Sequence, residues 1–131
     1  MKIRDNISEV VLYSAFVFLF VAGLTTGLSA SACRKQTYHG EKKLRFCSIS
    51  LSVGSFLPHD AAKRSIIYVE RGIALSELGH AEEAVSDFRR ALDDVASSRA
   101  SYRQRIVERL EAEEAGSKAH KNFAAAMALR N

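Results

Sequence analysis

The chain has 131 residues, of which 47% are hydrophobic and 26% charged, with one proline and no tryptophan. This length allows a single small domain beside a targeting segment and excludes a multidomain architecture. The formal net charge is +4, and all of the excess lies between Cys33 and Arg45, so the rest of the chain is electrically balanced.

The N-terminal segment, residues 1–32, has the pattern of a secretory signal peptide. A charged start precedes an uncharged apolar run over Val10–Ala22, and small residues follow up to Ala32. This order predicts cleavage before Cys33 and export to the periplasm. The mature protein would then be soluble and begin at Cys33.

Two other fates of this segment stay open. The stretch from Val10 to Ala32 carries no charge and is long enough for an inner-membrane anchor formed by residues 10–32. Cys33 also fits a lipid attachment site, although Ala30 stands where such sites prefer leucine. Arg34 and Lys35 follow directly, and the positive-inside tendency favours keeping such residues in the cytoplasm.

Cys33 and Cys47 are the only cysteines in the chain. An even pair behind an export signal predicts a disulfide that closes residues 33–47. Two unpaired thiols are the alternative. A zinc site is not expected, because the two cysteines and His39 together are one ligand short of a closed site. The segment carries a basic patch of five residues, Arg34, Lys35, Lys42, Lys43 and Arg45. We expect these side chains either to contact an acidic partner or an anionic membrane surface, or only to aid solubility.

A helical domain is expected over residues 44–115. Leu44–Leu51 predicts a short helix, and Asp60 is the expected N-cap of the next helix. That helix ends at Gly79, because a glycine favours the left-handed conformation that closes a helix. A second amphipathic helix follows to Val95. Its charged residues are expected to face water: Asp87, Arg89, Arg90, Asp93 and Asp94.

Small and aromatic residues alternate at fixed places along this helical pair. They are Tyr68, Gly72, Gly79, Ala84, Phe88 and Ala91. Residues 65–98 thereby resemble a tetratricopeptide repeat, a helix–turn–helix unit of about thirty-four residues. Arg71 departs from the usual leucine, and Ala96 stands where a proline often closes the unit. The resemblance implies an all-α fold in which small residues let the two helices approach closely.

The resemblance also implies a concave groove that is lined by the first helix and receives a peptide or a partner helix. On this register the groove-lining positions are Ile66, Val69, Ile73, Ser76 and Glu77. The surface is largely apolar, so it would take an amphipathic partner segment. The alternative is that the chain's own Leu44–Leu51 helix fills it, since a small protein needs every apolar contact.

Two further helices are expected after the repeat. Ser101–Glu114 has an apolar line and predicts a capping helix that covers the exposed edge of the repeat. Residues 116–131 contain strong helix formers from Lys118 to Arg130 and form a C-terminal helix or tail. The whole arrangement is a tetratricopeptide-like domain flanked by a half-repeat and capping helices.

The sequence contains no nucleophile–base constellation, phosphate-binding glycine loop or two-histidine metal motif. We therefore expect no enzymatic activity, no cofactor and no metal. The expected partner is another protein and not a nucleic acid. The predicted function is that of an exported adaptor or accessory subunit in the bacterial envelope. The alternative is a single-pass, membrane-anchored assembly or stability factor for a membrane protein complex.

Overall fold

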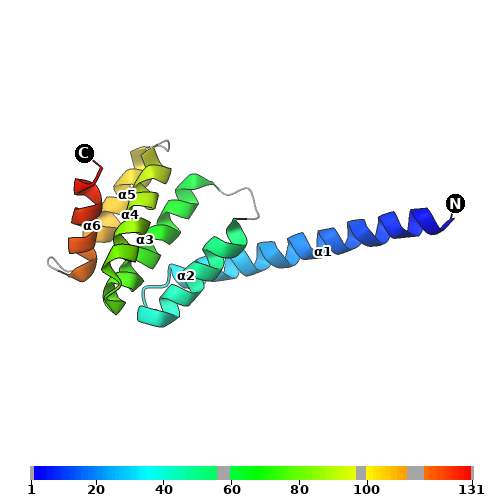
Figure 1. Ribbon diagram of the computed structural model, residues 1–131, viewed down its shortest axis with the longest axis horizontal. Helices are drawn as coiled ribbons and strands as arrows, with labels where there is room; N and C mark the ends of the chain where they lie inside the picture. The colour runs from blue at the N-terminus through cyan, green and yellow to red at the C-terminus, as the bar shows by residue number, and fades with distance from the viewer. Residues whose placement is uncertain (1, 56–59, 97–99, 112–116, 131) are drawn as a thin grey trace.

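A computed structural model describes residues 2–55, 60–96, 100–111 and 117–130, with side chains from Ile7 onward. Over these residues the chain is all-helical, as expected. The helices are α1 (Lys2–Cys33), α2 (Gly40–Gly54), α3 (Ala61–Leu78), α4 (Ala81–Ala96), α5 (Ala100–Glu111) and α6 (Lys118–Ala128). Helix α1 projects as a long rod from a body formed by α3 to α6, and α2 lies between the rod and the body (Figure 1).

The α3–α4 hairpin forms the centre of the body, and both of its predicted caps are present. The Asp60 carboxylate accepts a hydrogen bond from the backbone N–H of Ala62 at 3.0 Å, so it satisfies a free donor of the first turn of α3. Gly79 closes α3 with φ of 86°, and the N–H of His80 donates to the carbonyl of Leu75. Local sequence thus fixes where α3 begins and ends.

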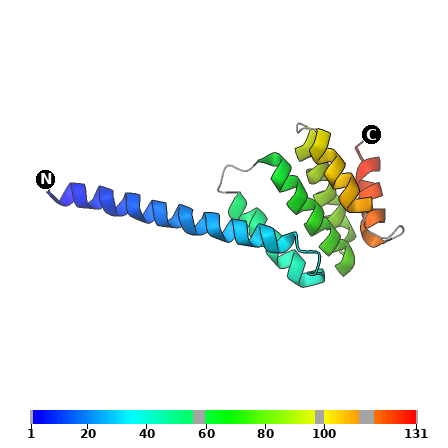
Figure 2. The same cartoon turned by 180° about the vertical axis from the view of Figure 1, so that it is seen from behind.

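The core is built around the close approach of α3 and α4. Phe88 of α4 is fully buried and lies against Gly72 of α3. On its other side Phe88 meets the ring of Phe123 edge-on, with ring centroids 5.6 Å apart. Helix α6 therefore docks on the hairpin. Of the two expectations for the C-terminal segment, a helix or a tail, the structure shows the helix. Helix α5 runs alongside α3 on the face seen in Figure 2 and ends at Glu111. The last residues of the predicted capping helix, 112–114, lie outside the described residues.

The end of α1 packs against α2 through a stripe of small residues. On α1 the buried members are Ala22, Thr26, Ser29 and Cys33. They recur every three or four residues, so they share one face of the helix. Cys33 forms a disulfide with Cys47 of α2, with Cα atoms 4.8 Å apart, which confirms the predicted cysteine pair. The structure corrects the extent of the expected loop, because α2 begins at Gly40 and leaves only residues 34–39 between the helices.

The rest of α1 is apolar on every side and exposed. Its exposed large side chains run from Ile7 to Leu28 and include Tyr13 and four leucines at Leu12, Leu19, Leu24 and Leu28. The stretch Ile7–Cys33 has a mean hydropathy of 2.1 in its most apolar window, of which only 6% is buried. By length and composition this helix can cross a membrane, as a signal sequence or as an anchor.

Candidate functional site

A groove runs along one face of α3 between α2 and α4. Its floor is formed by Arg64, Tyr68, Arg71 and Leu75, which recur at helical spacing. The α2 wall consists of Leu44, Ser48, Leu51, Gly54 and Ser55, and the α4 wall of Glu83, Ser86, Asp87, Arg90, Asp93 and Asp94. Two adjacent cavities of about 480 and 370 Å³ share Arg90 and form this α2–α4 groove.

Two ion pairs join the floor of the groove to its α4 wall. Arg71 donates Nε and Nη2 hydrogen bonds of 2.6 and 2.8 Å to the two carboxylate oxygens of Asp87. Arg64 makes the same two-bond contact with Asp94, at 2.7 and 2.6 Å. Such fork-to-fork pairs fix geometry as well as charge. Both arginines of the floor therefore already have charged partners within the chain.

The hydrogen bonds from Asp87 raise the pKa of Arg71 above its ordinary value, and its partial burial opposes this only in part. Asp94 raises the pKa of Arg64 in the same way. Both ion pairs thus favour the charged form of the guanidinium group. Asp87 was expected to face water and is instead only 2% exposed, because Arg71 compensates its charge.

Tyr68 lies at the centre of the floor, half-buried, with an arginine on either side. The guanidinium carbons of Arg71 and Arg90 lie 5.7 and 5.8 Å from its ring centroid. These distances allow cation–π attraction, which is stronger for a ring that is partly desolvated. An aromatic ring between cations in a groove is a surface suited to another protein's side chains, because aromatic residues and arginine are enriched at interfaces.

The face of α3 that was expected to bind a partner is closed in the structure. Val69 and Ile73 are each 1% exposed and belong to the same core cluster as Ile106 and Leu110 of α5. Ser76 is fully buried and accepts a hydrogen bond from the side-chain amide of Asn122 at 2.9 Å. The alternative prediction, that the Leu44–Leu51 helix fills this groove, is also wrong. Helices α5 and α6 cover this face, and α2 packs on another side of α3.

The two remaining residues of that predicted groove have other surroundings. Ile66 is half-buried beside α5, where it lines a shallow cavity with Arg105 and Ile106. Glu77 accepts a 2.7 Å hydrogen bond from the backbone N–H of Gly40, and its other oxygen lies 3.2 Å from Nδ1 of His39. Glu77 therefore caps the first turn of α2, a role that requires a carboxylate near a helix N-terminus.

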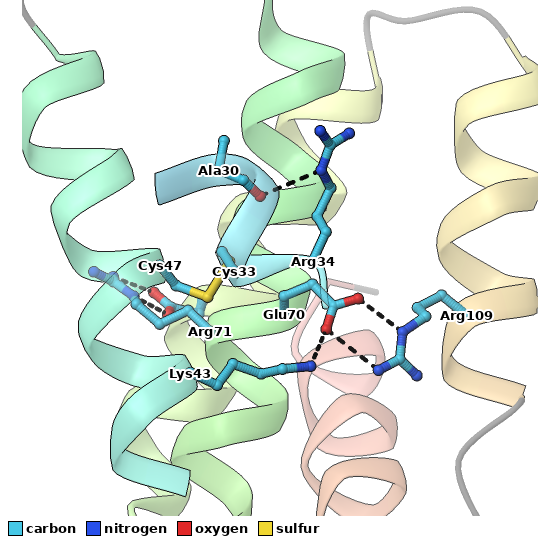
Figure 3. Close-up of a disulfide and its surroundings, with 9 residues drawn as sticks. Ala30, Cys33, Arg34, Lys43, Cys47, Glu70, Arg71 and Arg109 are labelled. Carbon is cyan, nitrogen blue, oxygen red and sulfur yellow. Dashed lines mark hydrogen bonds and ion pairs between the residues drawn. A yellow bond between two sulfur atoms is a disulfide. The ribbon is translucent and has the colours of Figure 1, made fainter. Parts of the chain in front are cut away.

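A buried charge cluster connects three helices beneath the disulfide (Figure 3). Lys43 of α2 donates a 2.6 Å hydrogen bond to the Glu70 carboxylate of α3. Arg109 of α5 donates to both oxygens of the same carboxylate, at 2.7 and 3.2 Å. Lys43 is 1% and Glu70 3% exposed. Buried charges are tolerated only when they are paired and hydrogen-bonded, so this cluster fixes the mutual placement of α2, α3 and α5.

The predicted basic patch is therefore smaller than expected. Lys43 does not belong to it, because Glu70 compensates its charge inside the protein. The other four members, Arg34, Lys35, Lys42 and Arg45, are exposed. Tyr38 stacks on Phe46. Two of these cations lie near the Tyr38 ring, since the ammonium groups of Lys42 and Lys35 are 4.0 and 5.6 Å from its centroid. Arg34 and Lys35 thus lie in the loop, and Lys42 and Arg45 lie on α2.

Among the described residues no group of three or more histidine, cysteine or carboxylate side chains is placed to hold a metal. His39 pairs with Glu77, and His80 lies 3.1 Å from Glu83 in the turn before α4. No family model, curated protein or solved structure matches the chain. The candidate site therefore rests on the geometry of this chain alone.

Sequence reasoning missed the α2–α4 groove, the Glu70 cluster and the role of Glu77. One signal was present in the sequence. Arg71 replaces an expected leucine, and Asp87 lies sixteen positions later on the facing helix, where it is able to compensate the charge. No comparable signal marks Lys43, because its partner follows 27 residues later on another helix.

Proposed function

We propose that the protein is a membrane-anchored, tetratricopeptide-like interaction module that binds a segment of a partner protein in the α2–α4 groove. The observation that carries the anchor is the packing of Ala22, Thr26 and Ser29 against α2. Cleavage before Cys33 would remove these residues and uncover the part of α2 around Ser50, which lines a cavity together with Thr26 and Ala30 of α1. A retained α1 keeps that part covered, so we favour the anchored form over the cleaved one.

The disulfide sets the proposed orientation. A Cys33–Cys47 bond persists in an oxidising compartment, which supports an exported position for the body. This orientation puts Arg34 and Lys35 outside, against the positive-inside tendency. We give the disulfide more weight because it closes a buried contact between two helices, whereas loop charge only biases insertion.

The shape and chemistry of the groove support a helical partner segment. The floor from Arg64 to Leu75 extends over about 17 Å at 1.5 Å per residue, which matches roughly three turns of a partner helix. Tyr68 and Leu75 offer apolar contact at its base, as Leu44 and Leu51 do on one wall. An amphipathic helix that lays its apolar face into such a groove is a common recognition mode.

The charges of the groove support selectivity rather than catalysis. Arg64 and Arg71 are already paired with carboxylates inside the groove. Arg90 and Asp93 are exposed on its α4 side and offer one charge of each sign to a partner. Rim charges of this kind mainly steer association and reject wrong partners. The proposed function is accordingly non-catalytic binding, as an adaptor or assembly factor in the cell envelope.

The experiment is site-specific photocrosslinking in the native host. A photoreactive residue replaces Ser48 or Ser86, which line opposite walls of the groove, and Arg103 on exposed α5 serves as the matched control. We expect one adduct of the same mass from both wall positions and none from position 103. Tyr68→Ala should remove the adduct without changing the helical content of the protein. An adduct from position 103 with none from the groove would contradict the proposed site.

A further inference from the structure

The proposed anchoring of α1 fixes how deep the body sits in the bilayer. The uncharged part of α1 that precedes its first buried residue, Val10–Val21, has twelve residues and spans about 18 Å. A bilayer's hydrocarbon core is about 30 Å thick and needs roughly twenty residues. A span that begins at Val10 therefore has to continue to about Ser29. The bilayer must reach the part of α1 that already packs against α2.

The antiparallel pairing of α1 and α2 shows which part of α2 lies at that level. Cys33 and Cys47 are level with each other because of the disulfide. Counting backward along α1 from Cys33 and forward along α2 from Cys47 places Leu51 level with Ser29 and Gly54 level with Thr26. The last turn of α2 thus overlaps the outer end of the span over about 5 Å, at 1.5 Å per residue.

The last turn of α2 is suited to this position. No charged residue occurs from Phe46 to Ser55. The end of the helix also satisfies its own polar groups, since the N–H of Ser55 donates to the carbonyl of Leu51 and its hydroxyl donates to the carbonyl of Ser52 at 2.7 Å. Backbone groups near the hydrocarbon region need such partners because little water is available there.

Two cations lie beside this part of α1, on the side next to α3. Lys63 and Arg34 line a groove of about 360 Å³ whose floor is the small-residue face of α1 at Gly23, Thr26 and Gly27. Both cations are exposed. Cations near an anionic leaflet strengthen binding to it by electrostatic attraction. A small-residue face with cations beside it offers room for acyl chains and a counter-charge for lipid phosphates.

We propose that the last turn of α2, Leu51–Ser55, enters the outer edge of the hydrocarbon region beside α1, and that Lys63 and Arg34 contact the anionic lipid headgroups next to it. The protein would then hold the membrane with two helices rather than one. The body would be seated close to the bilayer surface, with its orientation set by α2 instead of by a flexible connection. This inference rests on the proposed anchoring of α1.

The test uses tryptophan depth measurements, which suit this chain because it has no tryptophan of its own. Single-tryptophan variants of the full-length protein are inserted into vesicles of brominated phosphatidylcholine, with or without phosphatidylglycerol. Ser52→Trp reports on the exposed side of the α2 end, Phe18→Trp on the middle of α1, and Leu129→Trp on the exposed end of α6. Ser52 is exposed, so the replacement does not disturb packing.

We expect bromine to quench Phe18→Trp and Ser52→Trp, with a blue-shifted emission for both, and to leave Leu129→Trp unquenched. Quenching of Ser52→Trp should increase when phosphatidylglycerol is present, and Lys63→Gln with Arg34→Gln should remove that increase. Quenching of Phe18→Trp without quenching of Ser52→Trp would overturn this inference and leave the anchor intact. No quenching of Phe18→Trp would overturn the anchor itself. Equal quenching of Ser52→Trp in vesicles with and without phosphatidylglycerol would overturn the role of the two cations.

Discussion

Phe88 lies so close to Gly72 that no side chain fits between α3 and α4 at this point. A Cβ atom added to Gly72 would come within 2.7 Å of Cε1 of Phe88. Phe88 has no free direction to move, because it is fully buried and meets Phe123 on its other side. The distance between the two central helices therefore depends on a glycine.

The first prediction concerns this contact. Gly72→Ala should lower the free energy of unfolding by about 1–3 kcal/mol through overpacking, although alanine is the better helix former. Gly27→Ala is the matched control, since a Cβ there meets nothing within 4 Å and α1 should gain or keep its stability. Chemical denaturation of both variants measures the difference. The cost of Gly72→Ala should shrink in a Phe88→Leu background, and an unchanged cost would show that the contact is not its cause.

The second prediction concerns the buried charge cluster. Glu70→Gln removes the buried carboxylate that pairs with Lys43 and Arg109. Removing one partner from a buried ionic cluster costs about 3–5 kcal/mol. We expect a loss of this size in thermal or urea unfolding of the full chain.

Two further variants separate the cluster from general effects of losing a carboxylate. Glu83→Gln removes a carboxylate whose side chain is 67% exposed and should change stability by less than about 1 kcal/mol. Replacing the whole cluster, with Lys43→Met, Glu70→Leu and Arg109→Met together, should recover most of the loss, because no uncompensated charge remains. A triple variant less stable than Glu70→Gln would contradict this account of the cluster.

The third prediction concerns the disulfide. Replacing Cys33 and Cys47 by serine opens a loop of about fifteen residues and should cost about 3 kcal/mol. The loss should appear first as separation of α1 from α2, since the α3–α4 hairpin has its own core. Amide hydrogen exchange checks this order. Faster exchange in Gly40–Gly54 than in Ala81–Ala96 is expected, and uniform loss of protection would contradict it.

The sequence predicted those parts of the fold that depend on neighbouring residues. Asp60 and Gly79 act through hydrogen bonds within one turn, so their roles were readable from the order of residues. The cysteine pair was predictable for a different reason, because few alternatives exist for two cysteines.

The site was not predicted, because it depends on which side of α3 each neighbouring helix takes. Val69 and Ile73 form an apolar line that fits an open groove and a buried seam equally well. The choice between them is made by α5 and α6, which follow more than twenty residues later. Lys43 was assigned to a basic patch because its charge partner, Glu70, belongs to another helix. The periodicity of residues within one helix does not show which residues of other helices will pair with it.

The central claim is that α1 remains part of the working protein and holds the body at the membrane. Intact mass spectrometry of the protein purified from its native host tests it most directly, in samples with and without reductant. We predict a chain that retains the residues before Cys33, recovered from the membrane fraction, with a mass lower by two hydrogen atoms before reduction because of the Cys33–Cys47 bond. A soluble chain that begins at Cys33 would contradict the account, and so would a Cys33 terminus that carries acyl mass.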